Sequence, residues 1–235
     1  MAIRLLTFDL DNTLWAVEPI IVEAEAAMYS WIEQNCPGTS QLYSPEGLRQ
    51  YKAELAECYP SMRHQISKLR YETLRRAFMQ AGVSHDEAVA LAGEAFAVFH
   101  QARNRVTFFD DALQTLEDLN KDLALIAVSN GNADLKMIGI HHLFDHHFNA
   151  ENVGAAKPSP DMFHAALNAA GVAAHESIHI GDHPVEDIAT AATLGMKTIW
   201  VNFDDRVWPL DHVRADAEIT HWSQLAQQVE RLADR

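Results

Sequence analysis

Two aspartates at the end of the first apolar run have the types and spacing that point most directly to chemistry. Asp9 and Asp11 lie two positions apart in FDLDNTL (residues 8–14), so an extended chain directs both side chains to the same side. Such carboxylates repel each other unless they share a cation, and an oxygen-rich site suits Mg²⁺, which keeps waters as its other ligands. The alternative is that Asp11, Asn12 and Thr13 only form a turn and cap the next helix.

A second acidic pair follows another apolar run. Asp182 and Asp187 lie in GDHPVED (residues 181–187), where Gly181 allows a sharp turn and Asp187 falls just inside the next helix. Both could simply stabilise the positive end of that helix. Two strands that each end in an acid pair would nevertheless concentrate carboxylates at one edge of a sheet. A shared metal ion is the simplest way to make that arrangement tolerable.

Ser129 and Lys157 add phosphate-binding chemistry to the carboxylates. The hydroxyl of Ser129 and the backbone amides of Asn130 and Gly131 can bind phosphate oxygens, because a turn before a helix leaves N–H groups unpaired. Lys157 precedes Pro158 and a helix, and its ammonium group could lie beside the same oxygens. Taken singly, the serine could be a helix cap and the lysine a solvated surface charge.

Short apolar runs alternate with helical segments and predict the fold class, an α/β protein with a doubly wound parallel sheet. Ser159 is expected to cap a helix that starts at Pro160 and ends at Gly171. In such sheets, ligands bind beyond the carboxyl ends of the strands. The runs that predict strands are residues 1–9, 123–129, 177–182 and 197–201, with weaker candidates at 144–149 and 218–220.

The segment from about residue 15 to residue 105 breaks this alternation. Its apolar residues recur at helical spacing, and Ser84 and Glu87 form a capping-box pattern. We therefore predict a catalytic α/β core from residues 1–14 and 106–235, with an inserted all-α cap domain over residues 15–105.

Composition excludes several classes of function. The net charge of −15 argues against nucleic acid, which requires a basic face. The apolar run at the N-terminus is too short for a signal peptide, and no run is long enough to cross a bilayer, so a cytoplasmic protein without membrane contact is expected. Two cysteines are too few for a disulfide framework. Oligomeric state cannot be read from this pattern.

The four motifs in order resemble those of the haloacid dehalogenase superfamily of hydrolases. They are DLDNT, Ser129 in VSNGN, Lys157-Pro158 and Gly181-Asp182 followed by Asp187, and a helical cap after the first motif is typical of the C1-capped members. The turn after Ser129 and the length of the cap are most similar to the flavin mononucleotide phosphatase-type members. The resemblance covers the whole chain.

This resemblance implies roles for the matching residues. Asp9 would attack phosphorus and form an aspartyl-phosphate, and Asp11 would protonate the leaving alcohol and then activate water. Mg²⁺ would be held by Asp9, the Asp11 carbonyl, Asp182 and Asp187. Ser129 and Lys157 would bind the transferring phosphoryl group.

The resemblance favours an Mg²⁺-dependent phosphomonoester hydrolase that acts on a small phosphorylated metabolite, such as flavin mononucleotide or a ribityl phosphate. Asp11 and the second acid pair favour this over a 2-haloacid dehalogenase, although a phosphomutase of the same fold stays open. Arg70 in the predicted cap is a candidate substrate contact. The histidines of HHLFDHHF (residues 141–148) could chelate a metal only if the segment were helical, and a surface or packing role is the favoured interpretation.

Overall fold

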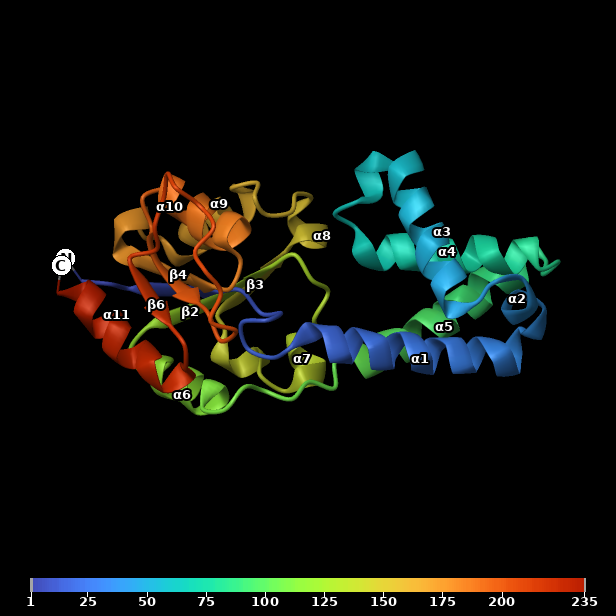
Figure 1. Ribbon diagram of the computed structural model, residues 1–235, viewed down its shortest axis with the longest axis horizontal. Helices are drawn as coiled ribbons and strands as arrows, with labels where there is room; N and C mark the ends of the chain where they lie inside the picture. Colours follow the sequence, from blue (N-terminus) through green and yellow to red (C-terminus); the bar gives the residue numbers. More distant parts are fainter. Residues whose placement is uncertain (1, 235) are drawn as a thin grey trace. The chain divides into compact units, whose positions relative to one another are not determined.

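The computed structural model describes residues 2–234 and divides into two compact units. An α/β unit comprises the chain up to Ala16 and from Thr107 onward, and a helical unit comprises Val17–Val106 (Figure 1).

A parallel sheet organises the α/β unit. Within the described residues its six strands lie in the order β3-β2-β1-β4-β5-β6, and every neighbouring pair is parallel. The first strand is central and fully buried, as an apolar run in a parallel sheet should be. The strands are β1 (Leu5–Phe8), β2 (Ala124–Ser129), β3 (His146–Asn149), β4 (Ser177–Gly181), β5 (Lys197–Val201) and β6 (Ala217–Ile219). The predicted α/β fold class is confirmed.

Helices cover both faces of this sheet, with α9 and α10 on one face and α6 and α11 on the other (Figure 1). Met162 and Phe163 of α9 pack in one apolar cluster with Leu5 of β1 and Ile126 of β2. The helices of this unit are α6 (Ala112–Leu119), α7 (Leu135–Ile138), η2 (His141–Leu143), α8 (Ala150–Val153), α9 (Asp161–Ala170), η3 (Ala174–Glu176), η4 (Pro184–Ala189), α10 (Thr190–Thr193), η5 (Trp222–Gln224) and α11 (Leu225–Ala233).

The helical unit has its own apolar core, formed by residues such as Met28, Ile32, Leu74 and Phe78. Its helices are α1 (Val17–Asn35), α2 (Pro37–Leu42), α3 (Pro45–Cys58), η1 (Pro60–Met62), α4 (Ile66–Gln80) and α5 (His85–Arg103). All of these elements are helical, as the spacing of the apolar residues in this segment predicted. Ser44 is the N-cap of helix α3, because its side chain accepts a hydrogen bond from the Gly47 amide.

Two helix starts differ from the sequence prediction. Helix α9 begins at Asp161 with Pro160 as its N-cap, while Ser159 instead donates a side-chain hydrogen bond to the Asp161 carboxylate. A helix does follow Ser84, but its side chain makes no capping hydrogen bond, so the predicted capping box is wrong. The acidic first turn of α5 supplies the stabilising charge instead. No helix in residues 2–234 is both long and apolar enough to span a membrane.

Candidate active site

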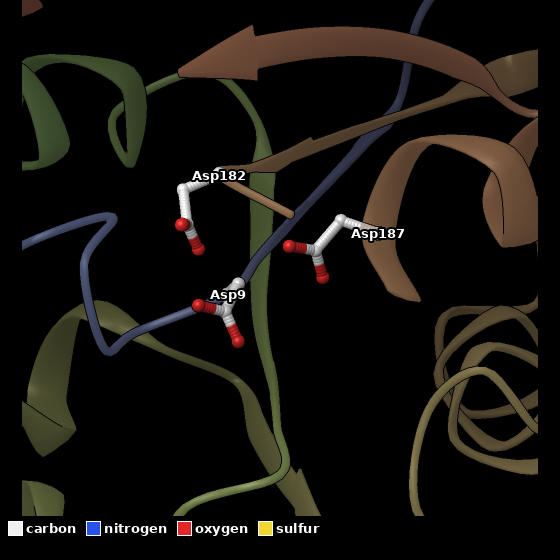
Figure 2. Close-up of side chains that lie close together, drawn as sticks. All are labelled: Asp9, Asp182 and Asp187. Carbon is white, nitrogen blue, oxygen red and sulfur yellow. The ribbon is translucent and has the colours of Figure 1, made fainter. Parts of the chain in front are cut away.

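Three aspartates from separate elements meet beyond the carboxyl ends of the strands. Asp9 follows β1, Asp182 follows β4 and Asp187 lies on η4, and carboxylate oxygens of the three lie within 4.8 Å of one another. Figure 2 shows the three carboxylates pointing toward a common centre. Asp9 and Asp187 are buried, whereas the side chain of Asp182 retains 13% exposure. The order of strands therefore assembles an all-oxygen ligand set from distant parts of the chain.

Lys157 is buried among these acids. Its Nζ atom donates to Asp9 Oδ1 at 2.6 Å, to Asp187 Oδ1 at 2.6 Å and to the Val128 carbonyl at 2.9 Å. Burial alone would lower the pKa of Lys157, but Asp187 and Asp9 outweigh it and hold that pKa above its usual range. The lysine is therefore a permanent cation that fixes the positions of two carboxylates.

Lys157 and the more exposed Arg206, which lies 3.5 Å from Asp182, do not neutralise three carboxylates. Burial raises the pKa of Asp9 well above its usual value, against the attraction of Lys157. Burial and the neighbouring Asp187 raise the pKa of Asp182 to about 6. The pKa of Asp187 is lowered, because Lys157 and His179 outweigh the effect of burial. This excess of negative charge in an oxygen-only ligand set fits a hard divalent cation such as Mg²⁺.

The carboxylate of Asp11 is held by a local turn. Asp11 Oδ1 accepts a hydrogen bond of 2.8 Å from the indole Nε1 of Trp15. Asn12 adopts φ of +61°, a conformation that asparagine tolerates better than most residues, and its amide donates to the Trp15 carbonyl. The sequence DNT thus does form a turn, as the alternative interpretation held, and that turn positions Asp11 at the pocket.

The turn after β2 also has a more specific structure than its sequence suggests. Ser129 is buried, and its Oγ accepts a hydrogen bond from the Gly131 amide. The Asn130 side chain bonds to both backbone groups of Lys157, accepting from its amide at 2.7 Å and donating to its carbonyl at 3.0 Å. Asn130 also donates to Glu186. Its side chain is therefore engaged in holding the backbone of Lys157.

Two buried residues behind the acids were missed by the sequence analysis. His179, on β4, lies 3.2 Å from Asp187 Oδ1 through Nε2 and 2.8 Å from the hydroxyl of Thr7 through Nδ1. Burial lowers the pKa of His179, so the ring is neutral. Nε2–H donates a hydrogen bond to the Asp187 carboxylate, so Nδ1 accepts a hydrogen bond from the Thr7 hydroxyl. The only available signal was a polar residue inside a fully buried apolar strand.

The residues predicted in the α/β unit line one pocket of about 180 Å³. They are Asp9, Asp11, Ser129, Asn130, Gly131, Lys157, Asp182 and Asp187, joined by Asn12, His183 and Glu186. Arg70 belongs to the helical unit, where it pairs with Glu25 at 3.0 Å and lies over the Phe99 ring. Its predicted contact with substrate stays a prediction.

The histidine-rich segment does not form a metal site. His141 and His142 lie on η2, whereas His146 and His147 lie on β3. Among residues 2–234, the only group of three or more histidine, cysteine or acidic residues placed to hold a metal is the Asp9, Asp182 and Asp187 cluster. The segment is thus not helical across His142 and His146, which removes the geometry that chelation required.

The fold and this cluster define a class of α/β proteins that gather carboxylates and a lysine at the ends of parallel strands. The chain belongs to the haloacid dehalogenase-like hydrolases, whose family model matches residues 3–195. Membership makes the protein a hydrolase of that superfamily, as the four motifs predicted.

Relatives with assigned activities include phosphatases. The chain is 30% identical over 199 residues to the Escherichia coli 5-amino-6-(5-phospho-D-ribitylamino)uracil phosphatase YigB, covering 85% of this chain and 83% of the relative. It is 29% identical to a glyceraldehyde 3-phosphate phosphatase of Methanopyrus kandleri, covering 84% and 83% of the two chains.

A solved structure described as a 2-haloacid dehalogenase from Pseudomonas syringae is also very similar. It shares 41% identity with this chain and superposes with a TM-score of 0.93, covering 98% of this chain and 100% of the other. The similarity extends over both units. The names of these relatives leave two reactions to compare, hydrolysis of a phosphate ester and dehalogenation of a 2-haloacid.

Proposed function

We propose that the protein is an Mg²⁺-dependent phosphomonoester hydrolase that acts through an aspartyl-phosphate on Asp9. The observation that carries this proposal is the bridge from Lys157 to Asp9 and Asp187 beside the more exposed Asp182. Such a site places a carboxylate nucleophile next to a fixed positive charge. It also leaves carboxylate oxygens that can bind a metal ion. Asp9, Asp182 and Asp187 would hold Mg²⁺, which would offset the charge of a phosphate dianion.

The residues of this chain supply the other steps. An Asp9 oxygen attacks phosphorus, the bond from phosphorus to the leaving oxygen breaks, and Asp11 gives that oxygen its proton. Water then attacks phosphorus while Asp11 takes one of its protons, the bond from phosphorus to the Asp9 oxygen breaks, and inorganic phosphate departs. This step regenerates the Asp9 carboxylate. Ser129 binds an equatorial oxygen, and the charge of Lys157 stabilises the negative charge that is spread over these oxygens during in-line transfer. Trp15 holds Asp11 within the pocket through its 2.8 Å hydrogen bond.

The proposed substrate is a small phosphorylated metabolite, with a ribityl or flavin phosphate as the first to test. Support comes from the name of the Escherichia coli relative, which acts on a ribitylamino phosphate. The helical unit would act as the cap that selects the substrate. This role follows from the resemblance to the C1-capped members, which carry a helical insertion after the first motif.

The test is hydrolysis of phosphorylated metabolites, compared by kcat/KM, with and without Mg²⁺. We expect free phosphate to be released only with the metal. Asp9→Asn should lower kcat by at least about 10³-fold, because the amide is not a nucleophile. If Asp9→Asn kept full activity, the nucleophile would be misassigned. Transfer to a second hydroxyl of the substrate without release of phosphate would indicate a mutase.

The description of the Pseudomonas syringae structure favours one second candidate, a 2-haloacid dehalogenase. That reaction expels halide, which needs no proton, so it gives Asp11 no task. Halide release from a 2-haloacid in chelator, without hydrolysis of any phosphate ester, would establish the second candidate. An Asp11→Asn variant separates the two as well, since only the phosphatase should lose turnover.

A further inference from the structure

One buried tryptophan near the end of the chain contacts the turn that carries the first acid pair. Trp222 is the first residue of η5, where His221 is the N-cap and accepts a hydrogen bond from the Ser223 amide. Trp222 lies beyond residues 3–195, the range that the family model matches. The four motifs therefore do not account for it.

The ring of Trp222 contacts residues on both sides of Asp9. It stacks on Phe8, the residue before Asp9, with ring centroids 6.3 Å apart and an angle of 21° between the planes. Its indole Nε1 donates a hydrogen bond of 3.1 Å to the backbone carbonyl of Thr13. Phe8 and Thr13 are fully buried, so water cannot replace either contact. The stacking fixes the plane of the ring, and the N–H group then fixes the position of Thr13.

Thr13 extends this contact to the carboxylate of Asp9. Its hydroxyl donates to Asp9 Oδ2 at 3.3 Å, whereas Lys157 donates to Asp9 Oδ1 at 2.6 Å. The two carboxylate oxygens thus have different donors, and the carboxylate keeps one orientation only while both donors stay in place. The amides of Thr13 and Leu14 both donate to the Leu10 carbonyl, so the Thr13 hydroxyl moves with this turn.

We propose that Trp222 is a positioning residue for the reaction at Asp9, because its indole N–H holds Thr13 and Thr13 orients the Asp9 carboxylate for attack. This inference rests on the proposed function, in which Asp9 is the nucleophile. A nucleophile held in one orientation reacts faster, while binding of the substrate need not change. Loss of the indole N–H should therefore lower kcat and leave KM constant.

The test removes the indole N–H and keeps the shape of the ring. Benzothienylalanine, in which sulfur replaces the N–H group, takes the place of Trp222 in the full chain, and hydrolysis of an aryl phosphate is measured with Mg²⁺. We expect kcat to fall about fivefold at constant KM, the usual worth of one neutral hydrogen bond. The matched control is the same replacement at Trp31, which packs against the core of the helical unit, and it should leave kcat unchanged.

A double substitution tests whether Trp222 acts through Thr13. Thr13→Val removes the hydroxyl that contacts Asp9. Replacing Trp222 in the Thr13→Val protein should therefore have no further effect on kcat, because the two changes break the same path of contacts. A residue that only stabilised the fold would have the same effect in both backgrounds.

Amide hydrogen exchange provides a readout that does not require turnover. Loss of the indole N–H should speed exchange of the Thr13 and Leu14 amides and leave exchange in the helical unit unchanged. If the unsubstituted protein released no phosphate, the proposed function would fail, whereas these exchange rates would still show whether Trp222 holds Thr13.

Three results would overturn the role of Trp222 in an active phosphatase. They are an unchanged kcat without the indole N–H, an equal fall of kcat in the Thr13→Val background, and unchanged exchange of the Thr13 and Leu14 amides.

Discussion

A buried chain of polar contacts runs from Thr7 through His179 and Asp187 to Lys157 and Asp9. Each link lies at 3.2 Å or less. The Asp187 carboxylate accepts from Nε2 and so fixes the ring tautomer of His179, and the Thr7 hydroxyl holds the ring through Nδ1. Thr7 and His179 do not touch a substrate in the proposed reaction, so they are positioning residues.

These polar contacts predict different results for two substitutions of Thr7. Thr7→Val removes the hydroxyl and leaves His179 Nδ1 without its donor, which should cost about 1–3 kcal/mol of unfolding free energy. We also expect kcat to fall about tenfold at constant KM, because Asp187 and Lys157 lose a fixed orientation. Thr7→Ser keeps the donor and should restore kcat.

The readout that separates positioning from stability is the nitrogen-15 spectrum of His179. Thr7→Val should shift the Nδ1 resonance, because Nδ1 loses its donor while Nε2–H still donates to Asp187, and Thr7→Ser should leave the Nδ1 resonance unchanged. Equal kcat values for the two Thr7 variants would show that the histidine has no part in positioning Asp187.

Among single residues, the sequence indicated the acids and the lysine because carboxylates and ammonium groups are typical metal and phosphate ligands. Asp9, Asp182 and Asp187 lie together, and Lys157 contacts two of them, while their catalytic roles stay predictions. Thr7 and His179 sit inside apolar strands, where a polar side chain gives no indication of its partner. Thr7 and His179 pair because β1 and β4 are neighbours and their register places the two residues opposite each other. One sequence does not specify this register.

Among the elements, the passage from β4 to η4 sets the geometry of the second acid pair. η4 is a π-helical turn, and the Asp187 side chain folds back over Gly181. A Cβ atom at Gly181 would lie 2.4 Å from Asp187 Cγ, closer than packing permits. The sequence indicated a turn at Gly181 but not the close approach of the Asp187 side chain, which is what requires a glycine. That approach depends on the π-helical turn of η4, which the sequence did not indicate.

This contact predicts contrasting effects for two glycine substitutions. Gly181→Ala must displace Asp187 from Lys157, which should destabilise the protein by about 1–3 kcal/mol and reduce kcat. Gly93→Ala lies on α5, where an added Cβ meets nothing within 4 Å. It should stabilise the protein by about 0.5–1 kcal/mol through helix propensity and leave kcat unchanged. Urea unfolding and steady-state kinetics measure both; an active, stable Gly181→Ala protein would refute the packing argument.

For the whole molecule, net charge and the acid cluster link stability to pH and metal. The raised pKa of Asp182, about 6, means that the folded state binds a proton more tightly than the unfolded chain does. Its stabilising contribution is therefore full below about pH 4 and is lost as pH rises through about 6.

In chelator at pH 7, Asp182→Asn should accordingly be more stable than the unsubstituted protein, by roughly 1–3 kcal/mol. The difference should shrink toward pH 4. Added Mg²⁺ should stabilise the unsubstituted protein more than the variant, since it binds the folded carboxylates. Unfolding curves at several pH values, with and without Mg²⁺, measure this. A variant less stable than the unsubstituted protein in chelator at pH 7 would contradict the assigned charge excess.

At this scale the alternation of strands and helices was enough to predict the parallel sheet, because burial of apolar runs and short connections leave few arrangements. The contact of Trp222 with the first turn was not predictable in the same way. Trp222 and Thr13 lie 209 residues apart, and the alternation of elements alone does not say which side chains meet.

The central claim is that Asp9 becomes phosphorylated, and the most direct measurement is to trap that intermediate. The protein is mixed with Mg²⁺ and an aryl phosphate, quenched in acid during turnover and treated with borohydride, which reduces an acyl phosphate to an alcohol. Peptide mass spectrometry should then find homoserine in place of Asp9, and only when both metal and substrate were present. Continued release of phosphate, with Asp9 unmodified at every time of quenching, would contradict the account.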